Sequence, residues 1–182
     1  MSPKIKRRII YVDASGKESN TEFKISIYDP EKSLTHILQL RECNNNSEAE
    51  RYAIFYALFY IKKFNYKNTH ILSDNLSAVN DKYIKKTSKE LGITVSWIPR
   101  EINLIADKMS KSEPTLKEKD WNILKLFVDL CTREEFLNSS FQNSNEEDLT
   151  KQLLNAKNKI NEQKKVIKSK DNQIAQLKKL KK

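Results

Sequence analysis

A short apolar run near the start of the chain constrains the fold more than any other stretch. Residues 8–16 read RIIYVDASG, a pattern that predicts a buried β-strand. Because side chains alternate along a strand, Asp13 shares one face with Ile9 and Tyr11, and the residues between them face the other way. We expect the strand to end at Asp13 and residues 15–17 to form a turn. The fold should therefore contain a sheet with a carboxylate at the end of one strand.

Two more strands follow at short intervals. Residues 22–28 alternate between apolar and polar side chains. Residues 34–40 do the same, and one side of that strand carries Leu34, His36, Leu38 and Leu40. A tight turn at residues 29–32 joins the two, because Asp-Pro-Glu-Lys is a turn-forming sequence. Three strands with short connections predict an antiparallel meander.

An amphipathic helix comes next. Residues 44–47 supply side chains that cap helix N-termini, and we expect the helix to run from about Glu48 to about Phe64. Glu50 begins a stripe at helical spacing that should lie on the sheet, together with Ala53, Ile54, Ala57, Leu58 and Ile61. Glu48 points roughly the opposite way, because two residues correspond to about 200° of helix.

The rest of the core alternates strands with helices. Strands are expected at residues 69–74 and 93–98, and a helix at residues 75–91, which Gly92 ends. A later helix carries Asp107, and its apolar side is expected to consist of Ile102, Ile105, Ala106 and Met109. This order predicts an α/β fold with a mixed five-stranded sheet flanked by helices.

Four carboxylates can converge at one edge of this sheet. Asp13 and Asp74 are each expected to end a strand, and parallel neighbours would bring both to the carboxyl edge, where α/β sheets place ligands. Glu50 begins a helix packed on the sheet, and Asp107 lies on a helix that starts soon after the fifth strand. Because bare carboxylates repel one another, divalent cations would stabilise such a cluster. Oxygen ligands of this kind suit Mg²⁺ or Mn²⁺, and two ions about 4 Å apart would clamp a scissile phosphate.

Four short motifs carry a resemblance to a known family. They are Val12-Asp13-Ala14-Ser15, Ala49-Glu50-Arg51-Tyr52-Ala53 with Ala57-Leu58, Leu72-Ser73-Asp74, and Trp97-Ile98-Pro99-Arg100-Glu101-Ile102-Asn103 with Ala106-Asp107-Lys108. In their order, spacing and expected context they resemble the successive motifs of the ribonuclease H family, and in particular its short reverse-transcriptase-like domains. The resemblance covers residues 6–112.

The resemblance implies a function and a role for each acid. Asp13 resembles the carboxylate that bridges both metal ions. Glu50 and Asp74 would complete one metal site, and Asp107 would complete the other. The substrate would be the RNA strand of an RNA–DNA hybrid, which two Mg²⁺ or Mn²⁺ ions would hydrolyse to leave a 3′-hydroxyl and a 5′-phosphate.

Several points stay open in the sequence. Glu48 competes with Glu50, although the helical stripe and the motif favour Glu50. The segment from Pro99 to Asp107 has no histidine, a residue that assists product release in some family members. Arg100 either contacts phosphate or pairs with a neighbouring acid. Two other functions compete with hybrid cleavage: a catalytically silent binding or adaptor module of the same fold, and a same-fold nuclease acting on another structured nucleic acid.

The C-terminal third of the chain has a different character. A further helix is expected from about residue 114 to about residue 137, closing a ribonuclease H-like domain at residues 1–137, and a polar linker at residues 138–147 follows. Residues 148–182 show a heptad pattern with Leu153, Ile160, Ile167 and Ile174 at its a positions. This pattern predicts a basic helix that forms a coiled coil with a second copy or with a partner helix. A lone helix is the alternative, because two of the five d positions, Gln163 and Lys170, are polar.

Charge and composition set the remaining bounds. The net charge of +10 suggests a polyanionic partner, and residues 146–182 contribute most of it through 11 lysines against five acidic residues. Cys43 and Cys131 have no metal-binding spacing and should be small buried hydrophobes. With no apolar run of membrane-spanning length and no signal-peptide pattern, we expect a cytoplasmic protein with no membrane partner.

Overall fold

The computed structural model describes residues 7–17 and 22–132, together with Asn155, Asn158 and Glu162. The chain divides into two units, Met1–Asn143 and Ser144–Lys182, and the fold below belongs to the first. Apart from the three isolated positions just named, the predicted linker at residues 138–147 and the predicted coiled coil at residues 148–182 lie outside the described residues.

Strands and helices follow one another as the sequence patterns predict. In chain order they are β1 (Arg8–Lys17), β2 (Glu22–Asp29), β3 (Leu34–Leu40), α1 (Asn46–Lys63), β4 (Thr69–Ser73), α2 (Leu76–Val79), α3 (Lys82–Glu90), β5 (Thr94–Trp97), the 3₁₀ helix η2 (Arg100–Ile102), α4 (Leu104–Ser110) and α5 (Glu118–Cys131). Within the described part of the chain, no helix is both long enough and apolar enough to span a membrane.

The five strands form one mixed sheet in the order β3-β2-β1-β4-β5. The first three strands pair antiparallel, and this confirms the predicted meander. β4 lies parallel to β1 on its other side, and β5 lies parallel to β4. The sheet order and the helices that flank it confirm the predicted α/β class and agree with a ribonuclease H-like fold.

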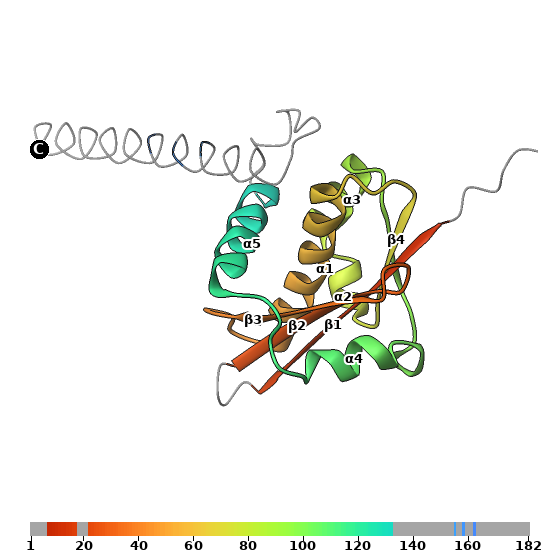
Figure 1. Ribbon diagram of the computed structural model, residues 1–182. Coiled ribbons are helices and arrows are strands. Elements are labelled where there is room, and N and C mark those ends of the chain that lie inside the picture. Colours follow the sequence, from red (N-terminus) through yellow and green to blue (C-terminus); the bar gives the residue numbers. More distant parts are fainter. Residues whose placement is uncertain (1–6, 18–21, 133–154, 156–157, 159–161, 163–182) are drawn as a thin grey trace, which may run out of the picture. The chain divides into compact units, whose positions relative to one another are not determined.

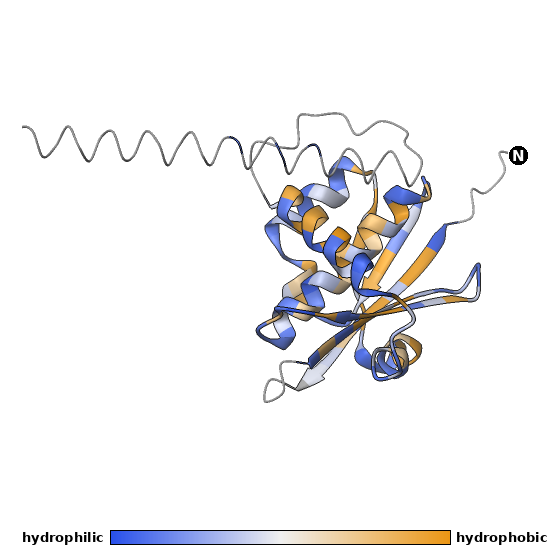
Figure 2. Ribbon diagram, turned by 60° about the vertical axis from the view of Figure 1, so that its left-hand side comes forward, coloured by the Kyte–Doolittle hydropathy of each residue, from blue (hydrophilic) through white to orange (hydrophobic). Residues whose placement is uncertain are grey.

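Helices cover the sheet on both faces. Figure 1 shows α1, α2, α3 and α5 on one face of the sheet and α4 on the other. The core lies mainly between α1 and the central strands, where Ile10, Val12, Ile54, Leu58 and Ile71 are fully buried. Figure 2 shows hydrophobic residues along the helices on this side of the sheet and along the central strands. Cys43 and Cys131 are buried free thiols, as predicted.

The first strand is longer than predicted. The expected turn at residues 15–17 is wrong, because β1 continues to Lys17 and pairs with β2 over this stretch. Gly16 permits the close approach of the two strands: a Cβ atom there would lie 2.3 Å from the Phe23 ring and 2.6 Å from the Glu22 carbonyl oxygen. Asp13 is therefore in the middle of a strand and does not end it.

Two predicted helices also differ from the structure. The single helix expected at residues 75–91 is two helices, α2 and α3, because the Asp81 carboxylate accepts hydrogen bonds from the backbone N–H groups of Tyr83 and Ile84 and starts a new helix. Gly92 follows α3 with a φ of 65°, as expected for a helix end. The helix expected from residue 114 begins only at Glu118.

The apolar side predicted for α4 is wrong. Ile102 and Ile105 are exposed, whereas Ala106 is buried as expected. The side of α4 that meets the sheet is instead small and polar, because Asn103 and Ser110 are buried beside Ala106. This helix therefore docks mainly through hydrogen bonds, and those bonds lead into the candidate site.

Candidate metal centre

Two strands place the first two carboxylates. The parallel pairing of β1 with β4 ends at the Tyr11–Leu72 pair. Asp13 lies two residues beyond that pair on β1, and Asp74 lies two residues beyond it, just after β4 ends. Both side chains therefore emerge where the parallel ladder stops, at the carboxyl edge of β4. The predicted juxtaposition holds even though Asp13 does not end its strand.

Helix α1 places the third carboxylate at its first turn. The Asn45 side chain accepts a hydrogen bond from the Glu48 backbone N–H, and the Glu48 carboxylate accepts one from the Asn44 backbone N–H, both at 2.8–2.9 Å. This reciprocal capping arrangement fixes the start of the helix and occupies Glu48. Glu50, two residues on, instead places a carboxylate oxygen within 4.8 Å of oxygens of Asp13 and Asp74. The structure thus directs Glu50, and not Glu48, to the sheet edge.

Asp13, Glu50 and Asp74 meet at one point. Each offers a carboxylate oxygen, and these oxygens all lie within 4.8 Å of one another. Asp13 is only 3% exposed. Burial and the neighbouring carboxylates raise the pKa of Asp13 to about 7 and that of Glu50 to about 9. Such mutual destabilisation of negative charge is what a bound cation would relieve.

The group also contains an unused ligand atom. Oε2 of Glu50 is buried and has no hydrogen-bond partner among the residues that the structure describes. A buried carboxylate oxygen without a donor is costly in a folded protein unless a ligand satisfies it. Three carboxylates with a free buried oxygen provide the hard oxygen donors that Mg²⁺ and Mn²⁺ prefer. The donor set therefore fits a divalent cation.

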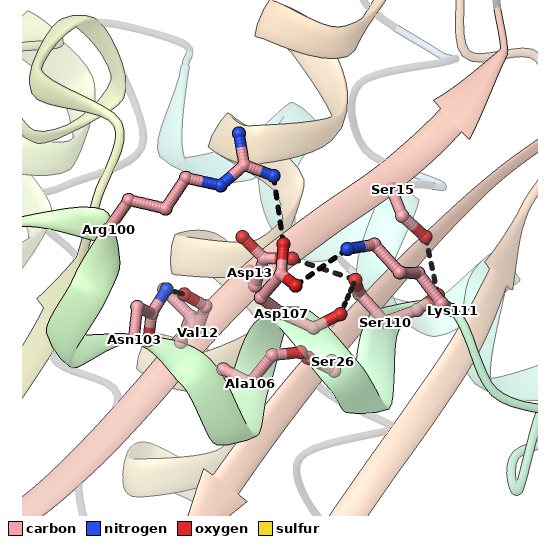
Figure 3. Close-up of polar contacts among 10 residues, drawn as sticks. All are labelled: Val12, Asp13, Ser15, Ser26, Arg100, Asn103, Ala106, Asp107, Ser110 and Lys111. Carbon is pink, nitrogen blue, oxygen red and sulfur yellow. Dashed lines mark hydrogen bonds and ion pairs between the residues drawn. The ribbon is translucent and has the colours of Figure 1, made fainter.

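Helix α4 braces the group from the other face of the sheet (Figure 3). The Ser110 hydroxyl donates a hydrogen bond of 2.7 Å to Oδ2 of Asp13, and the Asn103 side chain donates one of 2.8 Å to the Val12 carbonyl. The Ser26 hydroxyl donates to the Ala106 carbonyl at 2.8 Å. These bonds fix both the orientation of Asp13 and the position of α4 on β1 and β2.

Ser110 was not predicted from the sequence, and no docking role was predicted for Asn103. A usable signal was present, because positions 103, 106 and 110 share one side of a helix and carry small or polar residues only. A helix side of that composition indicates hydrogen-bonded docking rather than apolar packing.

The fourth predicted carboxylate lies beside the group but does not belong to it. Oδ1 of Asp107 pairs with Arg100 at 2.9 Å, and Oδ2 pairs with Lys111 at 2.6 Å (Figure 3). These two cations lower the pKa of Asp107, and the negative charge of Asp107 in turn helps to raise the pKa of Asp13. Asp107 is thus electrostatically coupled to the group while both of its oxygens are engaged elsewhere. Of the two roles open for Arg100, the structure shows pairing with a neighbouring acid.

The two histidines stand apart from this site. His36 bonds the Tyr56 hydroxyl at 3.0 Å, and His70 bonds the Ser96 hydroxyl at 2.7 Å. Burial lowers the pKa of both imidazoles. Both are strand residues that bond neighbouring hydroxyl groups and lie outside the carboxylate group.

No protein-family model and no curated protein matches the sequence. The case for a function rests on the sheet order and on the carboxylate group.

Proposed function

We propose that this protein is a metal-dependent endonuclease that hydrolyses the RNA strand of RNA–DNA hybrids. The single observation that carries the proposal is the meeting of Asp13, Glu50 and Asp74 within 4.8 Å at the edge of a β3-β2-β1-β4-β5 sheet. Three motifs that resemble the ribonuclease H family supply those three residues, and a fourth supplies Asp107 beside them. The ions in the proposal are Mg²⁺ or Mn²⁺, two in each site.

Each side chain has a defined task in this proposal. Divalent cations, when bound, supply positive charge that stabilises the charge developing on a phosphodiester and lowers the pKa of water. Asp13, Glu50 and Asp74 hold the cations, and the Ser110 hydroxyl keeps Asp13 oriented toward them. Asp107 extends the negative region on the Asp13 side, where a second ion would need a ligand.

The overall charge supports a polyanionic substrate. The chain carries a net charge of +10, and lysine and arginine outnumber acidic residues even though the site itself is acidic. Positive charge outside an anionic metal site attracts nucleic acid by counterion release while the metal ions neutralise the site.

Cleavage assays with the full-length protein test the proposal. We expect Mg²⁺-dependent cleavage of the RNA strand in a hybrid and no cleavage of a DNA duplex of the same sequence. An Asp13→Asn variant should lose the activity, whereas an exposed control, Glu101→Gln, should keep it. Equal inactivity of the wild type and Asp13→Asn would overturn the enzymatic assignment and leave the binding or adaptor module.

The same assay decides the substrate class. RNA duplex and branched DNA are included beside the hybrid, at equal phosphate concentration and ionic strength, because nucleic-acid affinity depends on salt. Selection of the hybrid would follow from contacts to 2′-hydroxyl groups on one strand only. Preferential cleavage of RNA duplex or branched DNA would keep the nuclease and replace the hybrid as substrate.

A further inference from the structure

Asp107 has a pair of cations of its own. Each of its two carboxylate oxygens receives one charged partner: Arg100 on Oδ1 and Lys111 on Oδ2 (Figure 3). The other three carboxylates of the region have a different environment, because their oxygens lie close together and Oε2 of Glu50 has no hydrogen-bond partner among the described residues. Arg100 acts on Asp13 and Glu50 only through its charge. The described part of the chain therefore contains one carboxylate cluster with no directly paired cation and one carboxylate that already has two.

The backbone at Asp107 is fixed, whereas the side chains of Arg100 and Lys111 are exposed to solvent. α4 is fixed on the sheet through Asn103, Ser110 and the Ala106 carbonyl, so the Asp107 backbone has little freedom. Lys111 follows Asp107 by one helical turn, and Arg100 reaches it from η2. The Arg100 and Lys111 side chains are 71% and 57% exposed, against 20% for Asp107. Both cations can leave the carboxylate by a change of rotamer, without any change in the fold.

We propose that Arg100 and Lys111 are positioning residues that act as built-in counter-cations of Asp107 and thereby weaken binding of a second divalent ion. This inference rests on the proposed function, because it assumes that Asp13, Glu50 and Asp74 take a first ion. A second ion would have to displace two hydrogen-bonded cations from Asp107 or approach against their charge. The protein without nucleic acid then holds one ion firmly and a second one weakly.

The competition has a definite physical basis. Arg100 and Lys111 lower the pKa of Asp107, so this carboxylate is ionised, yet its negative charge is compensated and both oxygens are occupied. Because both ion pairs are exposed to solvent, each should reduce the affinity of Asp107 for a second divalent ion only modestly. A polyanion that draws the two side chains away would release Asp107 as a ligand.

Counting bound Mn²⁺ in the full-length protein without nucleic acid tests this inference. Isothermal calorimetry and the loss of free-Mn²⁺ paramagnetic resonance give the number of ions and both dissociation constants. The wild type should bind a first ion tightly and a second one more weakly. In Arg100→Gln/Lys111→Gln, which removes both charges, the second ion should bind at least about fivefold more tightly, while the first changes less.

Two control variants separate local competition from general charge. Lys86→Gln/Lys108→Gln removes the same net charge at two exposed lysines, Lys86 on α3 and Lys108 on α4, and should leave the second constant close to that of the wild type. Arg100→Lys/Lys111→Arg keeps both charges and should also behave as the wild type. If Arg100→Gln/Lys111→Gln and Lys86→Gln/Lys108→Gln increase the affinity for the second ion equally, the effect is one of net charge, and the proposed competition at Asp107 is wrong.

The outcomes for the inference and for the metal site are distinguishable. Suppose that the wild type binds a first Mn²⁺ ion and that Asp13→Asn does not. An unchanged dissociation constant for the second ion in Arg100→Gln/Lys111→Gln would then overturn only the inference. Absence of any bound Mn²⁺ in the wild type would overturn the metal site and the inference with it. Two ions of equal, tight affinity in the wild type would show that Asp107 is already available and would also overturn the inference.

Discussion

At Asp13, the stability of the fold and the proposed binding of a metal ion make opposite demands. Its carboxylate is buried, and its pKa is raised to about 7 by burial and by Asp74 and Asp107, although the Ser110 hydrogen bond acts in the other direction. The folded protein thus carries an unfavourable carboxylate that a cation would stabilise. Stability and metal affinity should respond in opposite directions when this charge is removed.

An Asp13→Asn variant should be more stable than the wild type in EDTA, by an amount on the order of 1 kcal/mol, because one repelling carboxylate is gone. It should lose the increase in melting temperature that Mg²⁺ gives the wild type, since binding to the native state alone stabilises that state. Thermal unfolding with and without Mg²⁺ measures both effects. An Asp13→Asn variant that Mg²⁺ stabilises as much as the wild type would contradict the assigned role of Asp13.

The pH dependence of stability follows from the same group. Both Asp13 and Glu50 have folded-state pKa values above their ordinary values, about 7 and about 9, so the folded protein binds more protons than the unfolded chain. Their contribution to stability is fully present below the unfolded pKa values, near 4, and is lost as the pH rises through 7 and 9. In EDTA, urea midpoints should therefore fall between about pH 5 and about pH 9.

Metal ions and one substitution serve as controls for that pH profile. Mg²⁺ should flatten it, because the ion binds the ionised carboxylates and favours the form that predominates at high pH. Glu50→Gln should remove the part of the fall at the highest pH. A wild-type midpoint that rises with pH in EDTA would mean that the carboxylates do not repel one another in the native state.

At the scale of the element, alternation and helical spacing predicted most of the fold. β3 has the expected bounds, and β2 and α1 differ from the predictions by one or two residues at an end. β1 was misjudged because Ser-Gly-Lys is locally turn-forming, while the pairing of β2 with residues 15–17 depends on a partner strand. Local sequence cannot show a long-range partner that overrides a turn preference.

The candidate site was predictable to the extent that it depends on topology. Asp13, Glu50 and Asp74 could be placed together from strand order and from a helical stripe, and the structure brings these three together. The pairing of Asp107 with Arg100 and Lys111 could not be chosen in advance, because side-chain tips select partners in three dimensions. The side of α4 that docks on the sheet was predicted wrongly for a related reason. Asn103 and Ser110 contact β1 through hydrogen bonds, and a hydrophobic pattern does not indicate such contacts.

Substitution of the two glycines tests two local features of the backbone: the close pairing of β1 with β2 at Gly16 and the positive φ at Gly92 after α3. At Gly16 a new Cβ would meet the Phe23 ring and the Glu22 carbonyl, whereas at Gly92 it would meet nothing within 4 Å but the φ of 65° disfavours it. Gly16→Ala should therefore cost about 1–3 kcal/mol by overpacking, and Gly92→Ala about 1 kcal/mol by backbone strain. Urea denaturation measures both.

Asparagine at the same two positions distinguishes overpacking at Gly16 from backbone strain at Gly92. Gly92→Asn should recover part of the loss, because asparagine tolerates positive φ, whereas Gly16→Asn should be no better than Gly16→Ala. A Gly16→Ala variant as stable as the wild type would show that β1 and β2 are not closely paired at this point.

At the scale of the whole molecule, the chain combines an acidic site with a predicted basic extension. Residues 146–182 hold 11 lysines and five acidic residues, and their heptad pattern predicts a coiled coil. Two copies of the N-terminal unit joined in this way would gain effective concentration on one nucleic acid, if the proposed function holds, without any new contact at the site. The extension should therefore influence assembly and affinity and leave the chemistry unchanged.

Sedimentation velocity distinguishes self-association of the extension from binding to a different partner. We expect the full-length protein to sediment as a dimer and a chain ending at Asn143 as a monomer, because the a positions at residues 153, 160, 167 and 174 would be the seam. The matched control is Ile160→Glu/Ile167→Glu, which keeps the length and places like charges in that seam, and it should also be monomeric. A full-length protein that is monomeric across the accessible concentration range would contradict the homodimer, and the predicted helix would then need a partner from another protein, since isolated helices of this kind are marginal in water.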